Sequence, residues 1–298
     1  MIDSNSNHKK NIEASELILN ADGSVFHLKL LPHQIADDII LVGDPQRVSM
    51  ISDKFDNIEV KIENREFITH TGYFNNRRIT ALSTGIGTDN IDIVLNELDA
   101  LANIDLNNRT VKENHKSLNL IRIGTTGSLQ KHLPVDSFVL SEYGLGFDGL
   151  MHYYDYQHDI EEKIILDSFL EHCHWQGKYA EPYLVKASAL LSEKLGKNIT
   201  RGITATAGGF YGPQGRMLRL KLALPSLNDQ LGSFEFQKLQ ITNFEMETSA
   251  LFGLSKMLGH NACTICTIIA NRIAKQYSKD YKVSVDNLIN LVLERLTV

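Results

Sequence analysis

The stretch LNLIRIGTTG, residues 118–127, does most to decide the fold class. It opens on a strongly apolar run, which is typical of a buried strand, and it ends in a segment with two threonines and two glycines. A loop of that composition after a strand can hold an oxyanion through its backbone N–H groups, while Arg122 supplies positive charge. We therefore predict a strand in LNLIRIGTTG (118–127) whose end, from Arg122 onward, can serve as an anion-binding loop.

This loop lacks the features of nucleotide-phosphate loops. It has neither the G-K-[ST] ending of a Walker loop nor the full G-x-G-x-x-G of a dinucleotide site, so ATP and NAD are poor candidates. Inorganic phosphate or a sugar oxygen fits better. Three other arginine-bearing loops stand out, although each alone is more often an ordinary turn. They are GDPQRV (43–48), ENREF (63–67) and FYGPQGR (210–216).

Short β-rich runs alternate with longer helical patterns along the chain, which is the βαβ signature of an α/β fold. Apolar residues recur at helical spacing in IDIVLNELDALANI and ETSALFGLSKMLGH. We expect Asp89 or Asn90 to cap the first of these helices and Gly259 to end the second. The other predicted strands are DIILVG (38–43), RRITALSTG (77–85), SFVLSEY (137–143) and ACTICTIIA (262–270).

Polar segments mark the outside of this fold. Residues 1–23 form a polar leader, and residues 105–117 have no apolar period, so we expect an exposed surface excursion there. No linker is obvious, and we predict a single domain over residues 24–298.

Composition argues against several classes of function. The chain has 298 residues, 43% of them hydrophobic, and a formal net charge of -6. That charge argues against a general affinity for nucleic acid or for anionic membranes. No stretch supplies the roughly 18 apolar residues of a spanning helix, and the N-terminal residues lack the apolar core of a signal peptide. We expect a soluble, cytoplasmic protein.

The cysteines predict neither a disulfide framework nor a metal site. There are three, Cys173, Cys263 and Cys266, which suits a reducing compartment. Cys263 and Cys266 lie three apart on a predicted strand, so their sulfurs should face opposite sides of the sheet. The HCH run at 172–174 lacks a matching second cluster. We expect core cysteines and no metal.

Several motifs resemble the nucleoside phosphorylase-I family. VFHL, GDPQRV, REF, STGIG, RIGTTG, FYGPQGR, FEMETSA and the NR pair at 271–272 occur in the family's order and approximate spacing, over residues 24–295. The combination of RIGTTG with EMET is specific to the family. The resemblance is greatest to the bacterial branch that cleaves uridine. It implies a three-layer α/β/α fold with a central mixed twisted sheet.

The resemblance also implies a reaction, the reversible phosphorolysis of a nucleoside to free base and α-D-ribose 1-phosphate. This is a step of nucleoside salvage and catabolism, with phosphate as co-substrate and no cofactor. Members assemble as homodimers, commonly three to a hexamer, and two subunits share each active site. We therefore expect cleavage of uridine to uracil by a homo-oligomer that binds neither nucleic acid nor membrane.

The residue roles that the resemblance implies fall into groups. Phosphate would be held by Gly43, Arg47, Arg122 and Thr125, and by Arg65 reaching across from the neighbouring subunit. Ribose would be held by His27, also from the neighbour, and by Thr125, Glu245, Met246 and Glu247. The base would contact Thr126, Gly127, Phe210, Gln214, Arg216 and Arg272. The catalytic residues would be Arg122, Gln214 and Arg216.

Elementary chemistry agrees with these roles. Phosphorolysis needs an anionic nucleophile beside C1′ while the glycosidic bond breaks through an oxocarbenium-like state, and arginines can concentrate and orient phosphate there. The departing pyrimidine carries negative charge, which the Gln214 amide and the Arg216 guanidinium can stabilise. Purine-acting relatives place an aspartate near the end of the late strand, whereas this chain has Asn271 and Arg272 there.

Glu245 and Glu247 flank Met246 in TNFEMETSAL (242–251), and at the end of a strand residues two apart project from the same side. The acid and base of a glycosidase must lie across the scissile bond, which this spacing does not favour. A ribose offers one small polar target for both carboxylates, namely two adjacent hydroxyls. We predict that Glu247 is the principal sugar ligand and that Glu245 supports it.

Two departures from the bacterial pattern and three rival functions remain. STGIGTDN carries Thr88, Asp89 and Asn90 where bacterial relatives tend to have a Gly-Pro-Ser turn, which puts their monovalent-cation site with Glu66 in doubt. FYGPQGR transposes Gly and Pro, so the base pocket could be looser or shifted. The alternatives are a purine nucleoside phosphorylase, a hydrolytic nucleosidase and a non-catalytic nucleoside-binding relative.

Overall fold

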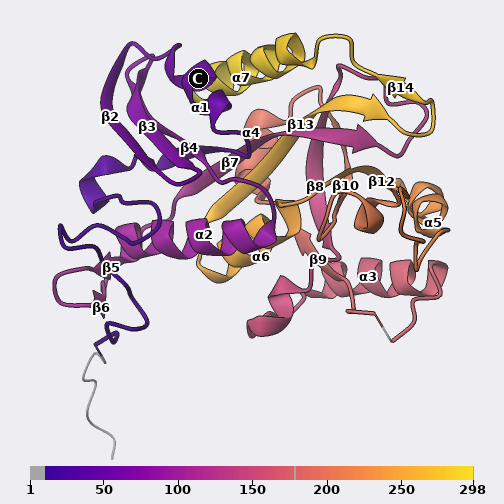
Figure 1. Ribbon diagram of the computed structural model, residues 1–298, viewed down its shortest axis with the longest axis horizontal. Helices are drawn as coiled ribbons and strands as arrows, with labels where there is room; N and C mark the ends of the chain where they lie inside the picture. Colours follow the sequence, from indigo (N-terminus) through magenta and orange to yellow (C-terminus); the bar gives the residue numbers. More distant parts are fainter. Residues whose placement is uncertain (1–10, 178, 298) are drawn as a thin grey trace, which may run out of the picture.

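The computed structural model describes residues 11–177 and 179–297. Its main element is a long mixed sheet with helices on both faces, so the predicted three-layer α/β/α fold is confirmed (Figure 1). The strands follow the order β11-β12-β10-β8-β13-β7-β1-β4-β3-β2. The central ones are β1 (Asp38–Val42), β4 (Arg77–Ser83), β7 (Asn119–Ser128), β8 (Phe138–Gly146), β10 (Thr200–Thr206), β12 (Leu239–Glu245) and β13 (Asn261–Asn271).

Shorter or outer strands complete the sheet. They are β2 (Asn57–Asn64), β3 (Phe67–Phe74), β9 (Tyr183–Lys186), β11 (Glu235–Phe236) and β14 (Gln276–Tyr277), while β5 (Ile104–Asp105) and β6 (Thr110–Val111) form a separate hairpin. β2 and β3 are antiparallel and lie at one edge. Every second residue of β2 is exposed, which is typical of an edge strand that no helix covers.

The middle of the sheet closes on itself. β12 pairs with β10 and also, antiparallel, with the end of β7, so that β7, β13, β8, β10 and β12 form a closed ring. β7 pairs with β1 as far as Arg122 and joins β12 at Gly127. Between these points residues 123–126 pair with β13 and have no strand partner on the other side within the described chain. Ligands of open α/β sheets bind where a strand changes neighbours.

The strand predicted in LNLIRIGTTG is confirmed by β7, but the anion-binding loop also expected at its end is wrong. Residues 122–127 are not a loop, because β13 stays beside β7 in parallel register and the strand continues through RIGTTG to Ser128. The backbone N–H groups that face β13 are engaged in the sheet and cannot cradle an anion. An anion at this place depends on side chains and on the open side of β7.

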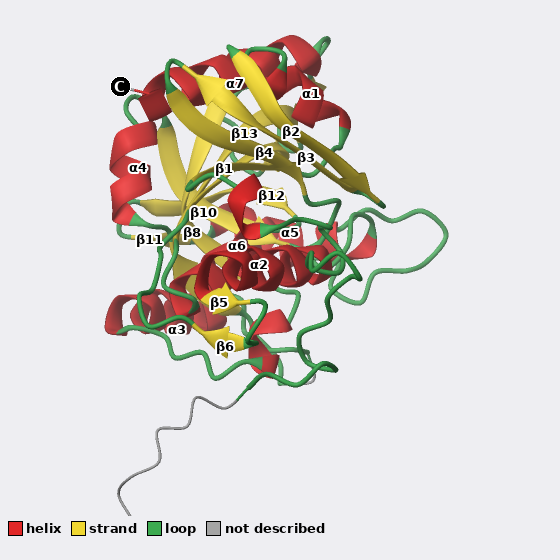
Figure 2. Cartoon of the chain, turned by 90° about the vertical axis from the view of Figure 1, so that its left-hand side faces the viewer, coloured by secondary structure: helices red, strands yellow, loops and turns green. Residues whose placement is uncertain are grey.

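The helices cover the two faces of the sheet (Figure 2). One core lies beneath α2 (Thr88–Asn103) and α6 (Thr248–Met257), and a second beneath α1 (Gln46–Ser52), α4 (Ala189–Leu195) and α7 (Tyr281–Thr297). A third joins α3 (Ile160–His172) and α5 (Leu227–Ser233) to the ring. Single 3-10 turns lie at η1 (Pro32–Gln34), η2 (Leu150–Tyr153) and η3 (Gly212–Gln214).

Both predicted helices form, but the first starts earlier than expected. Gly87 stands at the cap of α2, and Asp89 and Asn90 lie within its first turn, so neither is the cap. Glycine is needed at this cap because its φ is 100°. α6 ends just before Gly259, whose φ of 72° is the left-handed conformation expected there.

The segments expected to lie outside the fold contact each other. Residues 105–117 are mostly exposed, as predicted, and contain the hairpin strand β6. Arg109 in this segment donates a hydrogen bond to the carbonyl of Leu17, and its own carbonyl accepts one from the Ile12 amide. The polar leader therefore packs onto the excursion from Ile12 onward, while residues 1–10 lie outside the described chain. Among the described residues, the helices include none with the length and apolarity to cross a membrane.

Candidate active site

Two arginines lie near the point where β1 and β7 separate, close enough for their charges to interact. Arg47 is brought there by the first turn of α1, and Arg122 projects from β7. Burial lowers the pKa of Arg47; the carboxylate of Asp44 opposes this shift and the charge of Arg122 adds to it. Among the described residues the Arg47 guanidinium has no hydrogen bond or ion pair. Two close cations of this kind favour an anion between them.

The backbone beside these arginines is tightly packed. Gly43 follows β1 and lies against Gly85, since a Cβ on Gly43 would be 3.2 Å from the Gly85 carbonyl oxygen. Glu66 lies next to Gly85 and accepts a hydrogen bond from Asn90 at 3.3 Å. Gly43 therefore lets the end of β1 approach the backbone at Gly85.

Arg122 is buried, with 5% of its surface exposed, and holds both carboxylates of the EMET motif. Its Nη2 donates to Oε2 of Glu247, and its Nη1 lies 3.5 Å from Oε2 of Glu245. Its Nε is buried without a hydrogen-bond partner. Arg122 therefore keeps one unused buried donor, and a buried donor without a partner is costly unless a ligand completes it.

Gly124 explains how this guanidinium fits. A Cβ at Gly124 would lie 2.1 Å from Nη1 of Arg122 and 2.7 Å from the sulfur of Cys266. The arginine therefore folds back over residue 124, which only a residue without a side chain allows. Cys266 contacts this guanidinium, whereas Cys263 packs in the core beneath α1, α4 and α7. All three cysteines are free, as predicted.

The two glutamates have different surroundings. Glu245 accepts hydrogen bonds from the backbone N–H groups of Glu247 and Thr248, at 2.9 and 3.0 Å, and so holds the turn into α6. Glu247 accepts one from the Gly87 amide at 2.9 Å. Burial raises the pKa of Glu247; Arg122 opposes this shift and the charge of Glu245 adds to it. Both carboxylates contact Arg122 within the chain, and their predicted contact with a ribose stays a prediction.

The residues predicted to contact the base also gather in one place. Arg216 lies with its guanidinium 3.8 Å from the ring centre of Phe210 and donates to the side-chain oxygen of Gln214 at 2.6 Å. Arg272 donates to the backbone carbonyl of Gln214. Gly127 lies against the stem of Arg272, because a Cβ there would be 3.9 Å from it. This group therefore adjoins the end of β7.

Thr125, Thr126 and Met246 differ in what they can offer a ligand. Thr126 is buried, and its hydroxyl donates to the Phe244 carbonyl and accepts from the Asn243 amide, so it serves the ring of strands. Thr125 is half-buried on the open stretch of β7. Met246 is half-buried between the two glutamates. Side-chain contact with a ligand is therefore easier for Thr125 and Met246 than for Thr126.

His27 and Arg65 lie together on another part of the surface. Arg65 is exposed in the turn between β2 and β3, with its guanidinium 5.5 Å from the ring centre of Phe26. His27 packs edge-on against the same ring and contacts Glu97 at 2.7 Å. Within the described chain neither has a hydrogen bond or ion pair with the arginine pair. Their predicted roles, as donors to a neighbouring subunit, stay predictions.

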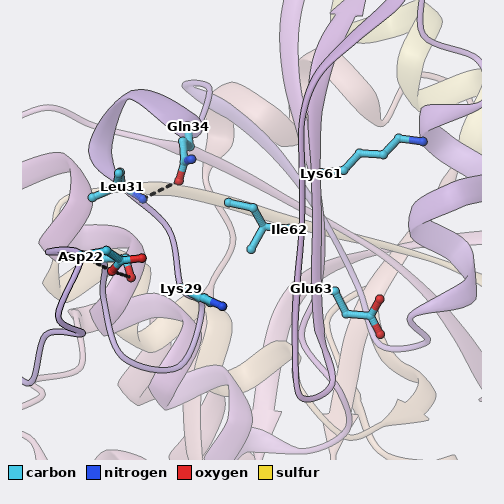
Figure 3. A pocket seen from close by; sticks show the side chains of 8 residues that line it. Asp22, Lys29, Leu31, Gln34, Lys61, Ile62 and Glu63 are labelled. Carbon is cyan, nitrogen blue, oxygen red and sulfur yellow. Dashed lines mark hydrogen bonds between the residues drawn. The ribbon is translucent and has the colours of Figure 1, made fainter.

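Several cavities lie outside the arginine cluster. A largely apolar one of about 930 Å³ shares Arg216 with the base group and is otherwise lined mainly by residues 218–224. A smaller one of about 300 Å³ lies between the segment 22–34 and β2, and Figure 3 shows its charged side chains, among them Lys29 and Lys61. It shares no residue with the predicted site.

One group of possible metal ligands lies away from the arginines, Asp99 with His115 and His260. His260 accepts a hydrogen bond on Nδ1 from the Leu118 amide at 3.2 Å, so the proton of its neutral ring is on Nε2, which lies 3.3 Å from Asp99. A metal on Nε2 would turn an Nδ1–H against that amide. These residues therefore suit a hydrogen-bonded histidine better than a metal, and the absence of a metal stays a prediction.

Sequence reasoning missed three residues around the glutamates. Gly87 binds Glu247 through its amide, Gly124 makes room for Arg122, and Thr206 donates to Glu245 at 2.7 Å. Both glycines lie in motifs noted in the sequence, STGIG and RIGTTG, but the motifs did not indicate what these glycines do. Nothing in TATAGG marked Thr206, because its partner lies 39 residues away.

Known proteins resemble the chain over most of its length. The model of the phosphorylase superfamily matches residues 37–296. The uridine phosphorylase of Thermococcus kodakarensis is 28% identical over 264 residues, which cover 87% of this chain and 81% of that protein. A purine nucleoside phosphorylase of Buchnera aphidicola is 24% identical, over 90% and 97% of the two chains. The structure of a Trypanosoma brucei nucleoside phosphorylase, described as showing uridine phosphorylase activity, superposes with a TM-score of 0.82 and 29% identity, over 94% of this chain and 99% of that one.

Proposed function

The chain belongs to the phosphorylase superfamily, and on that premise we propose that it catalyses the reversible phosphorolysis of uridine to uracil and α-D-ribose 1-phosphate. One observation carries the proposal: Arg47, whose guanidinium has no hydrogen bond or ion pair in the described chain, lies close enough to Arg122 for their charges to interact, and Arg122, with its unused buried Nε, contacts Glu247. This arrangement offers an anion and a sugar adjoining sites. Proteins with uridine phosphorylase in their names or titles are among the relatives.

Phosphate and ribose would bind on either side of Arg122. Phosphate would accept hydrogen bonds from Arg47, from Arg122 and from the hydroxyl of Thr125. Ribose would donate its 2′- and 3′-hydroxyls to Glu247, which is held in place by Gly87. A fixed ribose presents C1′ to the phosphate oxygen, and this orientation supplies much of the rate enhancement.

The base group would stabilise the leaving pyrimidine. As the bond from C1′ to the ring nitrogen breaks, the electron pair passes to the base, and a phosphate oxygen bonds to C1′. Gln214 and Arg216 are already oriented toward each other and would bind the base edge that becomes negative. Pyrimidine specificity is favoured over purine because the Asn271 amide is occupied with the carbonyls of Gln130 and Leu133, so that position offers no acid to protonate a purine.

The test is release of base from uridine, thymidine and inosine, each with and without phosphate. Uridine turnover that requires phosphate is the expected result. Inosine cleavage would select a purine phosphorylase, phosphate-independent release a nucleosidase, and binding without turnover a silent relative. In Arg122→Ala the phosphate KM should rise steeply while the circular dichroism spectrum is unchanged. Normal phosphate kinetics in that variant would remove Arg122 from the site.

We also propose that no organic cofactor or metal takes part and that inorganic phosphate is the co-substrate. The support is the site itself, whose charged groups are arginines and glutamates rather than a set of metal ligands. Activity should survive dialysis against a chelator and depend on added phosphate. Loss of activity that a metal ion restores would contradict this.

A homodimer or homohexamer with shared sites and a cytoplasmic location are further parts of the proposal. The exposed Arg65 and the half-buried His27 support shared sites, because neither has a hydrogen bond or ion pair with the arginine pair in the described chain. The three free thiols support a reducing compartment. Light scattering should give a mass of two or six chains, and cell fractionation should find the protein in the cytosol. A monomeric mass or a secreted protein would contradict these parts.

A further inference from the structure

Thr206 stands behind the glutamate pair, where no role has been assigned to it. It is the last residue of β10, is fully buried, and its hydroxyl reaches Oε1 of Glu245 at 2.7 Å. We propose that Thr206 is a positioning residue that fixes Glu245 and, through it, sets Glu247 for its grip on the ribose. The inference rests on the proposed function, because it concerns the same sugar site.

The direction of the Thr206 hydroxyl is fixed by its two partners. The backbone N–H of Ser249 donates to the Thr206 oxygen at 3.0 Å, so the single hydroxyl proton is directed to Glu245. With its only proton given to Glu245, this hydroxyl cannot donate to any other group. Thr206 therefore joins the start of α6 to the carboxylate of Glu245.

Glu245 passes this constraint to Glu247. With Oε1 held by Thr206, its Oε2 accepts the N–H of Glu247 at 2.9 Å, and both oxygens lie 3.0 Å from the N–H of Thr248. These bonds fix the backbone from which the Glu247 side chain projects. The carboxylate of Glu247 is then directed to the Gly87 amide and to Arg122. A tilt of the Glu245 side chain would move the Glu247 carboxylate relative to the Gly87 amide and the Arg122 guanidinium.

The other end of the network is anchored independently. The hydroxyl of Ser249 donates to Asp148 at 2.9 Å, and Tyr183 donates to the same carboxylate at 2.9 Å. Gly144 and Gly146 let β8 approach closely, since a Cβ on Gly144 would lie 2.8 Å from the Ser249 Cα. Ser249 is thus a fixed point against which Thr206 can hold Glu245.

The test compares Thr206→Val, which keeps the shape and removes the hydroxyl, with Thr206→Ser, which keeps the hydroxyl. Steady-state constants are measured for uridine and 2′-deoxyuridine at saturating phosphate. In Thr206→Val the kcat/KM for uridine should fall roughly tenfold, the scale of one hydrogen bond to a charged group. The fall for 2′-deoxyuridine should be smaller, because that substrate lacks one of the hydroxyls held by Glu247. The ratio of kcat/KM for uridine to kcat/KM for 2′-deoxyuridine should therefore fall, and Thr206→Ser should restore the wild-type ratio.

Thr71→Val is the matched control. Thr71 is as fully buried, its hydroxyl also makes two bonds at 2.8 Å, and it lies on β3 away from the glutamates. This control should lose comparable stability and keep the wild-type ratio. An unchanged ratio in Thr206→Val would overturn the inference, as would an equal change in Thr71→Val. If Thr206→Val does not fold, Thr206→Ala removes the same hydroxyl and is judged by the same ratio. Wild-type protein that cannot cleave uridine with phosphate would instead overturn the proposed function and, with it, this inference.

Discussion

Arg122 connects the two halves of the proposed site. The carboxylates of Glu247 and Glu245 raise its pKa although burial works in the opposite direction, so the guanidinium stays charged at every working pH. Two carboxylates against one guanidinium leave an excess of negative charge beside the place where a phosphate is proposed to bind. Arg47 offsets that excess. Both arginines are therefore expected to be necessary for phosphate, and a small displacement of either should matter.

Gly124→Ala tests this at the smallest scale. The new methyl group would lie 2.1 Å from Nη1 of Arg122, so the guanidinium must move. A displacement of about 1 Å costs roughly 100-fold in rate when geometry supplies the catalysis. We expect kcat/KM for phosphate to fall on that scale and the denaturation midpoint to fall as well, because the guanidinium is held by two buried carboxylates and the methyl group would also lie 2.7 Å from the sulfur of Cys266.

Gly232→Ala is the control for Gly124→Ala. A Cβ at Gly232, in α5, would meet its nearest neighbour, the Leu129 carbonyl, at an ordinary 3.4 Å. It should retain wild-type kinetics. Wild-type phosphate kinetics in Gly124→Ala would show that the position of the Arg122 guanidinium does not matter to phosphate.

The raised pKa of Glu247 predicts an acid limb in the pH profile. Protonated Glu247 accepts fewer hydrogen bonds from ribose, so kcat/KM for the nucleoside should fall as pH drops through that pKa, above the ordinary 4.5. Removing the neighbouring charge in Glu245→Gln lowers the pKa of Glu247, and the limb should move to lower pH. An acid limb that stays at the same pH or moves to higher pH would contradict the assignment of this limb to Glu247.

The same pKa shift affects stability. Because the pKa of Glu247 is raised in the folded state, folding takes up a proton. The contribution of Glu247 to the free energy of unfolding therefore falls as pH rises from about 4.5 through the folded-state pKa.

Sequence motifs located the residues of the site better than the contacts between them. Arg47, Arg122, the two glutamates and the base group were named as candidates from the motifs, and the structure brings them into two adjoining clusters, whereas His27 and Arg65 lie elsewhere. The pairing of Arg122 with Glu247 was not predicted, because 125 positions separate them and pairing depends on the ring of strands. Thr206 had no signal at all, since a threonine in a strand is ordinary until its neighbour is known.

At the scale of the element, the start of α2 links a helix to the sugar site. Gly87, the cap of α2, has φ 100° and ψ 164°, a region that only glycine adopts readily. The same residue donates its N–H to Glu247. Gly87→Ala should therefore lower the free energy of unfolding by about 1–3 kcal/mol and raise the KM for nucleoside, as measured by urea denaturation and steady-state kinetics.

Gly259→Ala separates strain from function. Its φ of 72° also favours glycine, but it ends α6 far from the glutamates, beside His115. This variant should lose stability, by about 1–2 kcal/mol, with the KM for nucleoside unchanged. If both variants raise that KM equally, the effect of Gly87→Ala comes from general loosening and not from its amide.

Periodicity predicted which elements exist, and it failed where partners decide their form. Helices α2 and α6 and strands β1, β4, β7, β8 and β13 were all located from the sequence. Residues 122–127 were expected to end the strand as an anion-binding loop because the segment offers glycines, hydroxyls and Arg122 after an apolar run, but β13 continues the pairing. The cap of α2 was misplaced by two or three residues, because a glycine at φ 100° cannot be told from an ordinary turn glycine.

At the scale of the whole molecule, the closed ring of strands fixes both clusters at once. β7 carries Arg122 and Gly127, and β12 leads to Glu245 and Glu247. Their antiparallel pairing at Gly127 and Phe244 holds the sugar cluster against the base cluster. The sequence predicted a mixed sheet but not its closure, because pairing between strands more than 100 residues apart leaves no local pattern.

Shared sites between subunits are best tested by mixing two inactive variants. Arg65→Ala and Arg122→Ala should each be nearly inactive, the first by removing what a subunit gives its neighbour and the second by removing its own phosphate ligand. In a mixed dimer, one site has the intact Arg122 of one chain and the intact Arg65 of the other, while the second site lacks both. Random mixing after reversible denaturation makes about half the dimers mixed, so about a quarter of wild-type activity should return. Arg47→Ala mixed with Arg122→Ala is the control, since both changes affect a subunit's own site and no site becomes intact. Recovery in the control, or none in the test mixture, would show that Arg65 does not serve a neighbour's site.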